Sequence, residues 1–307
     1  MNISEQMKAV DTEKQAIKTY LKSIGYNLDM IPFSMYHNII NGLIALVQLN
    51  TDYYVSVNGD DSNDGLKPST AFLTLNKAVT TASDGQSIGV LAGTYTGTSN
   101  CNLTISKNLT ITGEDGTIFD GENTRKSGWT LKSVVNITQI NFQNGSSNYG
   151  GAIYNNNGGN IINCTFDSNI SQYGGSGIFN KSIGNVSNCI FTNNTSSSGA
   201  ILNGSTGSIS NCTFDNNTAG YKGGGIANYS TGTIVNCIFR NNSAQFGGAI
   251  SRESTGEIID CTFSNNTASS SGGTILNMSG GAINNCDFLA TTSTNIYNDT
   301  IGVTIDG

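Results

Sequence analysis

Apolar residues recur along the second half of the chain with a fixed spacing. Six cysteines follow one another in steps of 25, 23, 25, 24 and 25 residues. Each has an isoleucine eleven residues before it, an isoleucine or valine three before it, and a phenylalanine two after it. All insertions that change the step fall between the phenylalanine and the next isoleucine. A fixed period in the low twenties indicates a repeat architecture. The cysteines are Cys164, Cys189, Cys212, Cys237, Cys261 and Cys286.

Each repeat predicts one coil of a parallel β-helix. The alternation Cys-x-Phe is typical of a strand, and a repeat of this length has room for three short strands and three turns. One coil cannot bury its own apolar face, so coils stack, roughly 4.8 Å apart. The Ile, Ile/Val, Cys and Phe positions then form ladders that fill the core. We expect about nine coils between residues 86 and 303.

Asparagine forms three further columns, one before the Cys, one three residues after the Phe, and one two residues after the first Ile. Asn tolerates left-handed backbone at turns, and stacked amides hydrogen-bond from coil to coil. We therefore interpret these columns as the corners of the coil. They include Asn163 and Asn188, Asn194 and Asn217, and Asn203 and Asn228, with Arg252 replacing Asn in the third column.

The first fifty residues follow a different pattern. Apolar residues from Ile3 to Ile24 alternate in steps of four and three, with Lys14 as the one polar position. This pattern fits an amphipathic helix on a small core and equally a short coiled coil that joins several subunits. We divide the chain into residues 1–50, a helical attachment or oligomerisation region, residues 51–85, an opening segment and cap, and residues 86–307, the β-helix.

Composition excludes several classes of function. The net charge is −7 and no basic cluster occurs, which argues against nucleic-acid binding. No apolar run reaches the length of a membrane span, and the charged, amphipathic start does not resemble a secretory signal. With no CxxC pair and one histidine, we expect neither a metal nor another cofactor. The ladder cysteines are expected to be unpaired core thiols.

The GGAI and FxxN motifs, at residues 150–153 and 239–242 among others, resemble repeats of chlamydial polymorphic outer-membrane proteins. They resemble adhesin-like proteins of methanogenic archaea more closely. Residues 54–65 and 71–78 are similar to the first segment of pectate-lyase-like β-helices. These resemblances cover about residues 53 to 300. They imply an all-β fold, a right-handed single-stranded parallel β-helix, which a small α-helical region precedes.

The stretch from Lys14 to Ile40 resembles the short adaptor at the start of some tailed-virus tail-fibre proteins. The secretory signal of the adhesins and the C-terminal barrel of the outer-membrane proteins have no counterpart in the sequence. We therefore expect a virion component rather than a cell-surface protein.

Pectate-lyase-like folds include lyases and glycosidases, and the cleavage of a glycosidic bond needs paired carboxylates. Asp167 and Asp215 both follow a core Phe, two coils and thus about 9.6 Å apart, near the upper limit for an inverting pair. Arg240 follows in the next coil. We interpret the two carboxylates as surface charge and keep them for a catalytic alternative. Asp60 and Asp64 have the spacing of a calcium loop without its terminal Glu, and we interpret them as a turn.

Binding has more support in the sequence than catalysis. The residue after each repeat Ile is expected to point outward, which gives an apolar row that needs a partner. Exposed aromatics precede the GGAI motifs and suit stacking on sugar rings. We expect Tyr154, Phe179, Tyr173 and Tyr221 to bind ligand. A subunit interface in a trimer explains the row equally well. The row is Tyr154, Phe179, Leu202, Ala227, Ser251 and Leu276, and the preceding aromatics are Tyr149, Tyr173, Tyr221 and Phe246.

The sequence thus predicts a host-recognition adhesin or tail-fibre protein of a tailed virus, with a methanogenic archaeon as one candidate host. It would bind a cell-surface glycan or wall polymer without catalysis. Residues 1–50 would attach it to other virion tail proteins, and a homo-oligomer, most simply a trimer, is expected. The alternatives are a cellular adhesin-like surface protein and a polysaccharide-degrading tailspike.

Overall fold

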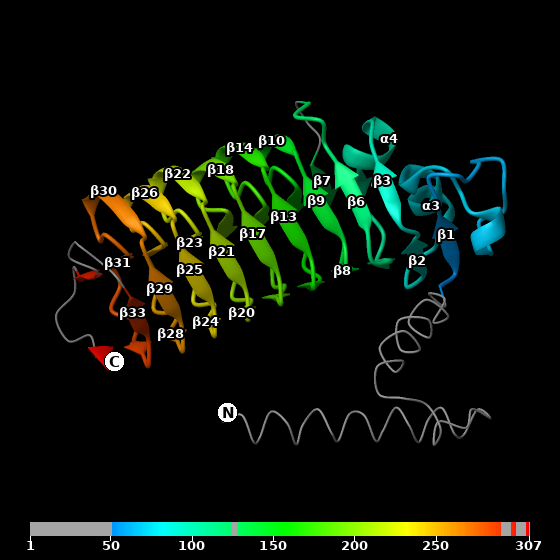
Figure 1. Ribbon diagram of the computed structural model, residues 1–307. Helices are drawn as coiled ribbons and strands as arrows, with labels where there is room; N and C mark the ends of the chain where they lie inside the picture. Colours follow the sequence, from blue (N-terminus) through cyan, green and yellow to red (C-terminus); the bar gives the residue numbers. More distant parts are fainter. Residues whose placement is uncertain (1–50, 125–127, 290–295, 299–304, 307) are drawn as a thin grey trace, which may run out of the picture. The chain divides into compact units, whose positions relative to one another are not determined.

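The computed structural model describes residues 51–124, 128–289, 296–298 and 305–306. The predictions for residues 1–50, including the seam around Lys14, lie outside these residues. Within the described part, short strands stack in parallel into four sheets, A to D (Figure 1). The chain runs through sheets A, B and C in turn, and from β10 to β30 it also forms a strand of sheet D between B and C. Sheets B and C contain nine described strands each, which agrees with the expected number of coils.

Sheet A carries the ladder of the second Ile or Val. Its strands are β1 (Tyr53–Val55), β2 (Ser87–Val90), β5 (Leu109–Gly113), β8 (Val135–Thr138), β12 (Ile161–Ile162), β16 (Val186–Ser187), β20 (Ile209–Ser210), β24 (Ile234–Val235), β28 (Ile258–Ile259), β32 (Ile283–Asn284) and β35 (Ile305–Asp306). Because β1 pairs with β2, sheet A already begins within the opening segment.

Sheet B carries the Phe ladder. Its strands are β3 (Gly93–Tyr95), β6 (Thr117–Asp120), β9 (Asn141–Gln143), β13 (Thr165–Asp167), β17 (Ile190–Thr192), β21 (Thr213–Asp215), β25 (Ile238–Arg240), β29 (Thr262–Ser264) and β33 (Asp287–Leu289). From Phe142 to Phe288, neighbouring rings stack with centroids between 4.7 and 5.3 Å apart. The predicted ladder is confirmed, at the spacing of stacked strands.

Sheet C carries the first Ile of each repeat. Its strands are β4 (Thr104–Ile105), β7 (Trp129–Leu131), β11 (Ile153–Asn155), β15 (Ile178–Asn180), β19 (Ile201–Asn203), β23 (Ile226–Asn228), β27 (Ile250–Arg252), β31 (Ile275–Asn277) and β34 (Ile296–Asn298). The repeat Ile side chains from Ile153 to Ile275 are fully buried.

Sheet D corrects the prediction of three strands in each coil. A fourth strand lies between sheets B and C, and these strands form one row along the solenoid (Figure 1). The strands are β10 (Ser146–Tyr149), β14 (Ile170–Gly174), β18 (Thr195–Ser198), β22 (Thr218–Lys222), β26 (Ser243–Phe246) and β30 (Thr267–Ser271). They are rich in Ser and Thr and bury only small side chains such as Ala219 and Ala244, so they lack the apolar alternation that marks a strand.

Two short helices and a 3-10 turn lie within residues 68–101. They are η1 (Pro68–Thr70), α3 (Leu75–Thr81) and α4 (Thr98–Cys101), of which α4 falls beyond the opening segment. The Thr74 hydroxyl caps α3 by accepting from the Lys77 N–H at 3.2 Å. At the other end, Lys107 Nζ donates to the carbonyls of Val79 and Thr80 at 3.0 and 2.8 Å, where a cation also favours the helix dipole. Among the described helices none is long and apolar enough to cross a membrane.

The asparagine columns form corners in two different ways. The column before the Cys, such as Asn163 and Asn188, has φ near 55°, as expected for left-handed turns. The other two columns are buried amide ladders, in which Asn194 Nδ2 donates to Asn217 Oδ1 at 2.9 Å and Asn180 Nδ2 to Asn203 Oδ1 at 3.2 Å. Buried amides that bond from coil to coil lock the register of the stack.

All seven cysteines are buried, and the six of the repeats form the expected column. Burial raises the pKa of Cys101 to about 12, and contact with the Cys237 thiol together with burial raises the pKa of Cys261 to about 12. Because all seven thiols are buried away from a reagent in solution, we expect the native protein to resist a thiol reagent at pH 8. After unfolding in urea without oxidant, all seven thiols should titrate. A lower count in the unfolded, never-oxidised chain would reveal disulfides and contradict this expectation.

Candidate functional site

The strands of sheet D alternate in length along the stack. The strands β14, β22 and β30 have five residues, whereas β10, β18 and β26 have four. The register shifts accordingly, so that Ser198 pairs with Lys222 and Phe246 with Ser271. An extra residue in one of two paired strands is a β-bulge, which re-aims side chains. The five-residue strands β14, β22 and β30 lie within the three cysteine steps of 25 residues. The four-residue strands β18 and β26 lie within the steps of 23 and 24 residues.

Four aromatic side chains meet where sheet D turns into sheet C, and we call them the aromatic patch. Tyr149, at the end of β10, lies at the centre, with its ring centroid 5.1 Å from Tyr173, 5.6 Å from Phe179 and 6.3 Å from Tyr154. Tyr154 and Phe179 lie 5.2 Å apart on adjacent strands. Tyr149 and Tyr173 are 45 and 48% exposed. Three of the four expected ligand-binding residues are therefore brought together, through Tyr149.

The fourth expected residue, Tyr221, belongs to a separate group two coils further on. Its ring meets that of Phe246 edge-on at 5.4 Å, and Lys222 Nζ lies 5.0 Å from its centroid and 5.8 Å from that of Tyr229. Lys222 also forms an ion pair with Glu253. Burial alone would lower the pKa of Lys222, but the hydrogen bond and charge of Glu253 raise it. Lys222 is thus a fixed cation rather than a base.

The predicted outward apolar row is only partly a free surface. Tyr154, Phe179 and Leu202 are half-buried, but Ala227, Ser251 and Leu276 are 0, 2 and 4% exposed. The reason is the glycine corner between sheets D and C. A Cβ at Gly199 would lie 2.8 Å from the Ala227 nitrogen, and one at Gly247 3.0 Å from the Leu276 nitrogen. The chain's own corners cover these positions, so this part of the row needs no partner.

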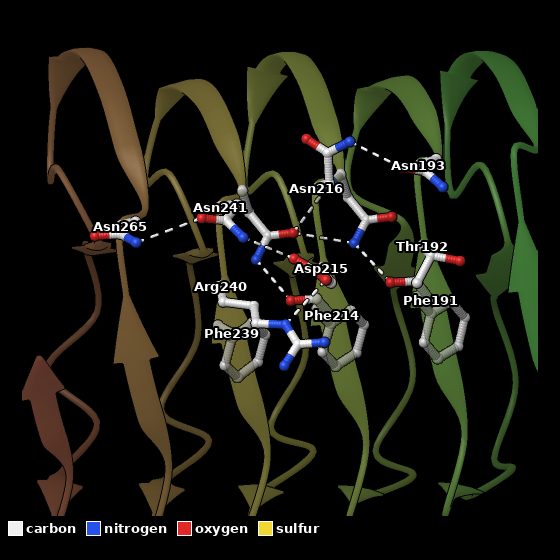
Figure 2. A network of polar contacts seen from close by, with 12 residues as sticks. Phe191, Thr192, Asn193, Phe214, Asp215, Asn216, Phe239, Arg240, Asn241 and Asn265 are labelled. Carbon is white, nitrogen blue, oxygen red and sulfur yellow. Dashed lines mark hydrogen bonds and ion pairs between the residues drawn. The ribbon is translucent and has the colours of Figure 1, made fainter.

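The carboxylates of the catalytic alternative, Asp167 of β13 and Asp215 of β21, belong to a lane of polar side chains along sheet B. Figure 2 shows the part of this lane around Asp215. Asp167 accepts hydrogen bonds from Thr192 Oγ1 at 2.6 Å and Asn193 Nδ2 at 2.9 Å. Asp215 pairs with Arg240, Nε to Oδ2 at 2.9 Å, and accepts from Asn241 Nδ2 at 2.9 Å. Thr192 lies between the two aspartates in register.

The polar side chains of this lane hydrogen-bond one another from coil to coil. Asn216 Nδ2 donates to Asn193 Oδ1 at 2.8 Å, and the side chains of each coil bond those of the next. Each carboxylate is engaged by its own donors, and an Arg neutralises one of them. Cleavage of a sugar needs an acid and a base carboxyl that both face one glycosidic bond. Asp167 and Asp215 are instead each hydrogen-bonded to side chains of the neighbouring coil.

The Asp60–Asp64 segment folds as turns. Asp60 Oδ1 accepts from the Ser62 N–H at 2.8 Å, and Asp64 Oδ1 from the Leu66 N–H at 3.1 Å and Thr70 Oγ1 at 2.6 Å. These bonds lower the pKa of both carboxyls. Side chains that bond the backbone two residues on are turn chemistry, which supports the turn interpretation. Among the described residues, no three His, Cys, Asp or Glu side chains converge as a metal site would require.

Comparisons with known proteins agree with this architecture. The model of the right-handed β-helix region matches residues 126–301. No curated protein sequence matches the chain. A rhamnogalacturonan lyase structure is similar with a TM-score of 0.52 and 14% identity, over 76% of this chain and 74% of that one. Pectin methylesterase PemA from Erwinia chrysanthemi aligns with a TM-score of 0.40 and 11% identity, over 82% and 81%.

At such identities, the lyase shows a shared fold and nothing further. The family model spans more than half of the chain, and the sheets described above are those of its fold. The chain therefore belongs to the right-handed β-helix family.

Proposed function

We propose that this protein binds a saccharide polymer through the aromatic patch and does not cleave it. The aromatic patch carries the proposal. Two tyrosine rings, Tyr149 and Tyr173, stand half-exposed beside each other on a scaffold of stacked strands. Rigid aromatic side chains give large contact area at low cost in conformational entropy, and such side chains dominate binding energy in most interfaces.

The surroundings of the patch support binding rather than turnover. The rings of Tyr149, Tyr154, Tyr173 and Phe179 contact one another and together form one aromatic surface. Asp167 and Asp215 of sheet B are held by their own donors, and Figure 2 shows those of Asp215. A polysaccharide-degrading enzyme is the second candidate because β-helices include the rhamnogalacturonan lyase. If cleavage occurs, Asp167 and Asp215 are the first residues to replace.

The biological setting of the proposal is host recognition. We place the protein in a virion tail as an adhesin or tail fibre, with residues 1–50 attaching it to other tail proteins and with three copies in the assembly. The resemblances of the GGAI and FxxN repeats and of the stretch from Lys14 to Ile40 support this placement. A cellular adhesin-like surface protein would use the same patch, and the position of the gene beside tail genes would distinguish the two.

Replacing both Tyr149 and Tyr173 by Ser is expected to lower affinity for the bound polysaccharide by at least about a hundredfold, since each exposed aromatic anchor contributes about 2 kcal/mol. The unmodified protein is first screened on an array of neutral, uronic-acid and amino-sugar polysaccharides. The affinities of both proteins are then measured for the polysaccharide that the unmodified protein retains. Circular dichroism and sedimentation check that the fold and the number of subunits are unchanged.

The matched control is Ile190→Ser with Ile238→Ser on sheet B. These side chains are 45 and 44% exposed, so the control removes similar apolar surface one sheet away. Unchanged binding by the tyrosine variant, or an equal loss in the control, would overturn the proposal. Dissociation of the assembly with binding retained would instead identify the patch as a subunit interface.

A further inference from the structure

A groove crosses sheet D next to the Tyr221–Phe246 pair. It has a volume of about 480 Å³ and lies over β26, with β22 on one side and β30 on the other. Its lining residues include Gly220 of β22, Ser243, Ala244 and Gln245 of β26, and Thr267 and Ser269 of β30. It is separate from the aromatic patch, which involves β10, β11, β14 and β15.

The groove follows from the alternating length of the strands. The strand β26 has four residues, while β22 and β30 on its two sides have five. The register shifts in both pairings, and the lining residues Gly220 and Ser269 lie in the stretches where the longer strands carry their extra residue. The lining also includes the small residues Ala219, Ala244 and Ala268. The hollow is therefore built into the backbone and needs no rearrangement to receive a ligand.

The chemistry of the lining selects an uncharged and hydroxyl-rich ligand. Hydroxyls of Ser243 and Thr267 and the exposed amide of Gln245 supply donors and acceptors, and no charged side chain lines the groove. Lys222 follows the groove residue Gly220 by two positions, but its ammonium is paired with Glu253. An acidic sugar would thus find no free cation here, and burying an unpaired carboxylate is costly.

Two aromatic side chains directly follow lining residues of the groove in the sequence. Gly220 precedes Tyr221, and Gln245 precedes Phe246. The two rings are in contact, and Tyr221 is 45% exposed. A saccharide chain in the groove would pass directly onto an aromatic edge, and aromatic rings beside a few polar groups are the usual composition of a ligand site.

We propose that this groove is a binding subsite for an uncharged linear saccharide, with Gln245 as its hydrogen-bonding residue and Tyr221 as its stacking residue. This inference rests on the proposed saccharide binding and deepens it, because it names the class of sugar as neutral. It also adds a second contact point along the stack, beyond the aromatic patch.

The test fills the groove. A side chain at Gly220 meets only ordinary contacts, since its Cβ would lie 3.8 Å from the Ser196 carbonyl oxygen, and the glycine is exposed. Gly220→Phe should weaken binding of cellohexaose and mannohexaose at least about tenfold by calorimetry, a loss of about 1.4 kcal/mol. Gly204→Phe is the matched control, because Gly204 is also exposed and open, with the Asn180 carbonyl oxygen at 3.6 Å. Gln245→Ala should also weaken binding, without altering the fold.

The outcomes separate this inference from the proposed function. In the NMR spectrum, the side-chain amide signals of Gln245 should shift with the neutral hexasaccharides and stay unchanged with hexagalacturonate. If Gly220→Phe binds the neutral probes as the unmodified protein does while Tyr149→Ser with Tyr173→Ser does not, the groove subsite is wrong and the aromatic patch stands. Equal binding of hexagalacturonate, or no binding of either neutral probe, also overturns the inference.

Discussion

Replacing Asn217 by Ala is expected to lower the free energy of unfolding by about 4 kcal/mol, because it removes four buried hydrogen bonds that contribute about 1 kcal/mol each. Asn217 Nδ2 donates to the Phe191 carbonyl and to Asn242 Oδ1, both at 3.0 Å. Its Oδ1 accepts from the Asn194 N–H at 3.0 Å and from Asn194 Nδ2 at 2.9 Å. The substitution therefore removes four buried hydrogen bonds and takes away the acceptor of the Asn194 N–H, while Asn194 Nδ2 keeps the Phe166 carbonyl and Asn242 Oδ1 keeps the backbone N–H of residue 217.

Urea denaturation followed by circular dichroism measures this effect. Because repeat proteins lose structure coil by coil, hydrogen exchange should locate the loss around Asn194 and Asn242. The control is Asn216→Gly at the exposed neighbouring position, whose φ of 55° suits glycine; it should change stability by less than about 0.5 kcal/mol. An Asn217 variant as stable as the control would mean that the amide ladder does not hold the coils together.

The second large effect is expected at Arg252, which replaces Asn in the buried column of sheet C. Its side chain is fully buried. It donates to Asn277 Oδ1 at 3.0 Å and to the Ala282 carbonyl at 3.1 Å, and further to the carbonyls of Gly256 and Gly281. Burial lowers the pKa of Arg252 to about 10, so the cation persists at neutral pH, stabilised by carbonyl groups.

Arg252→Ala should cost about 3–5 kcal/mol, since it leaves several buried acceptors unpaired and a cavity behind. Arg252→Asn restores the residue of the neighbouring coils and should recover most of that loss. Thermal unfolding of the two variants makes the comparison. If the Asn variant is as unstable as the Ala variant, the guanidinium has a role that a ladder amide cannot replace.

The core of the fold could be predicted from the sequence because its side chains repeat. The Ile, Cys and Phe positions recur at fixed distances from one another, and stacking identical inward positions is the one arrangement that buries them all. Sheet D could not be predicted in the same way. A strand such as Thr195–Ser198 contains no large apolar residue, and its backbone pairing follows from the neighbouring coils rather than from its own pattern.

The free surface was harder to predict than the core. Alternation along sheet C correctly places Ala227 and Leu276 on the outer side, but it carries no information on the glycine corners that cover them. The groove depends on a single extra residue in alternate strands. The unequal steps between the cysteines do show in the sequence that some repeats carry an extra residue. Only the structure shows that this residue lies in a strand of sheet D.

Binding without cleavage is tested most directly by measuring, for one polysaccharide, both its retention by the protein and its chain length afterwards. The polymer retained by the unmodified protein is passed over immobilised protein, and its bound amount and chain-length distribution are measured by size-exclusion chromatography. The account predicts that the unmodified protein retains the polymer at unchanged length, while the Tyr149→Ser and Tyr173→Ser double variant lets it pass. Shortened chains, or equal retention by the double variant, would contradict it.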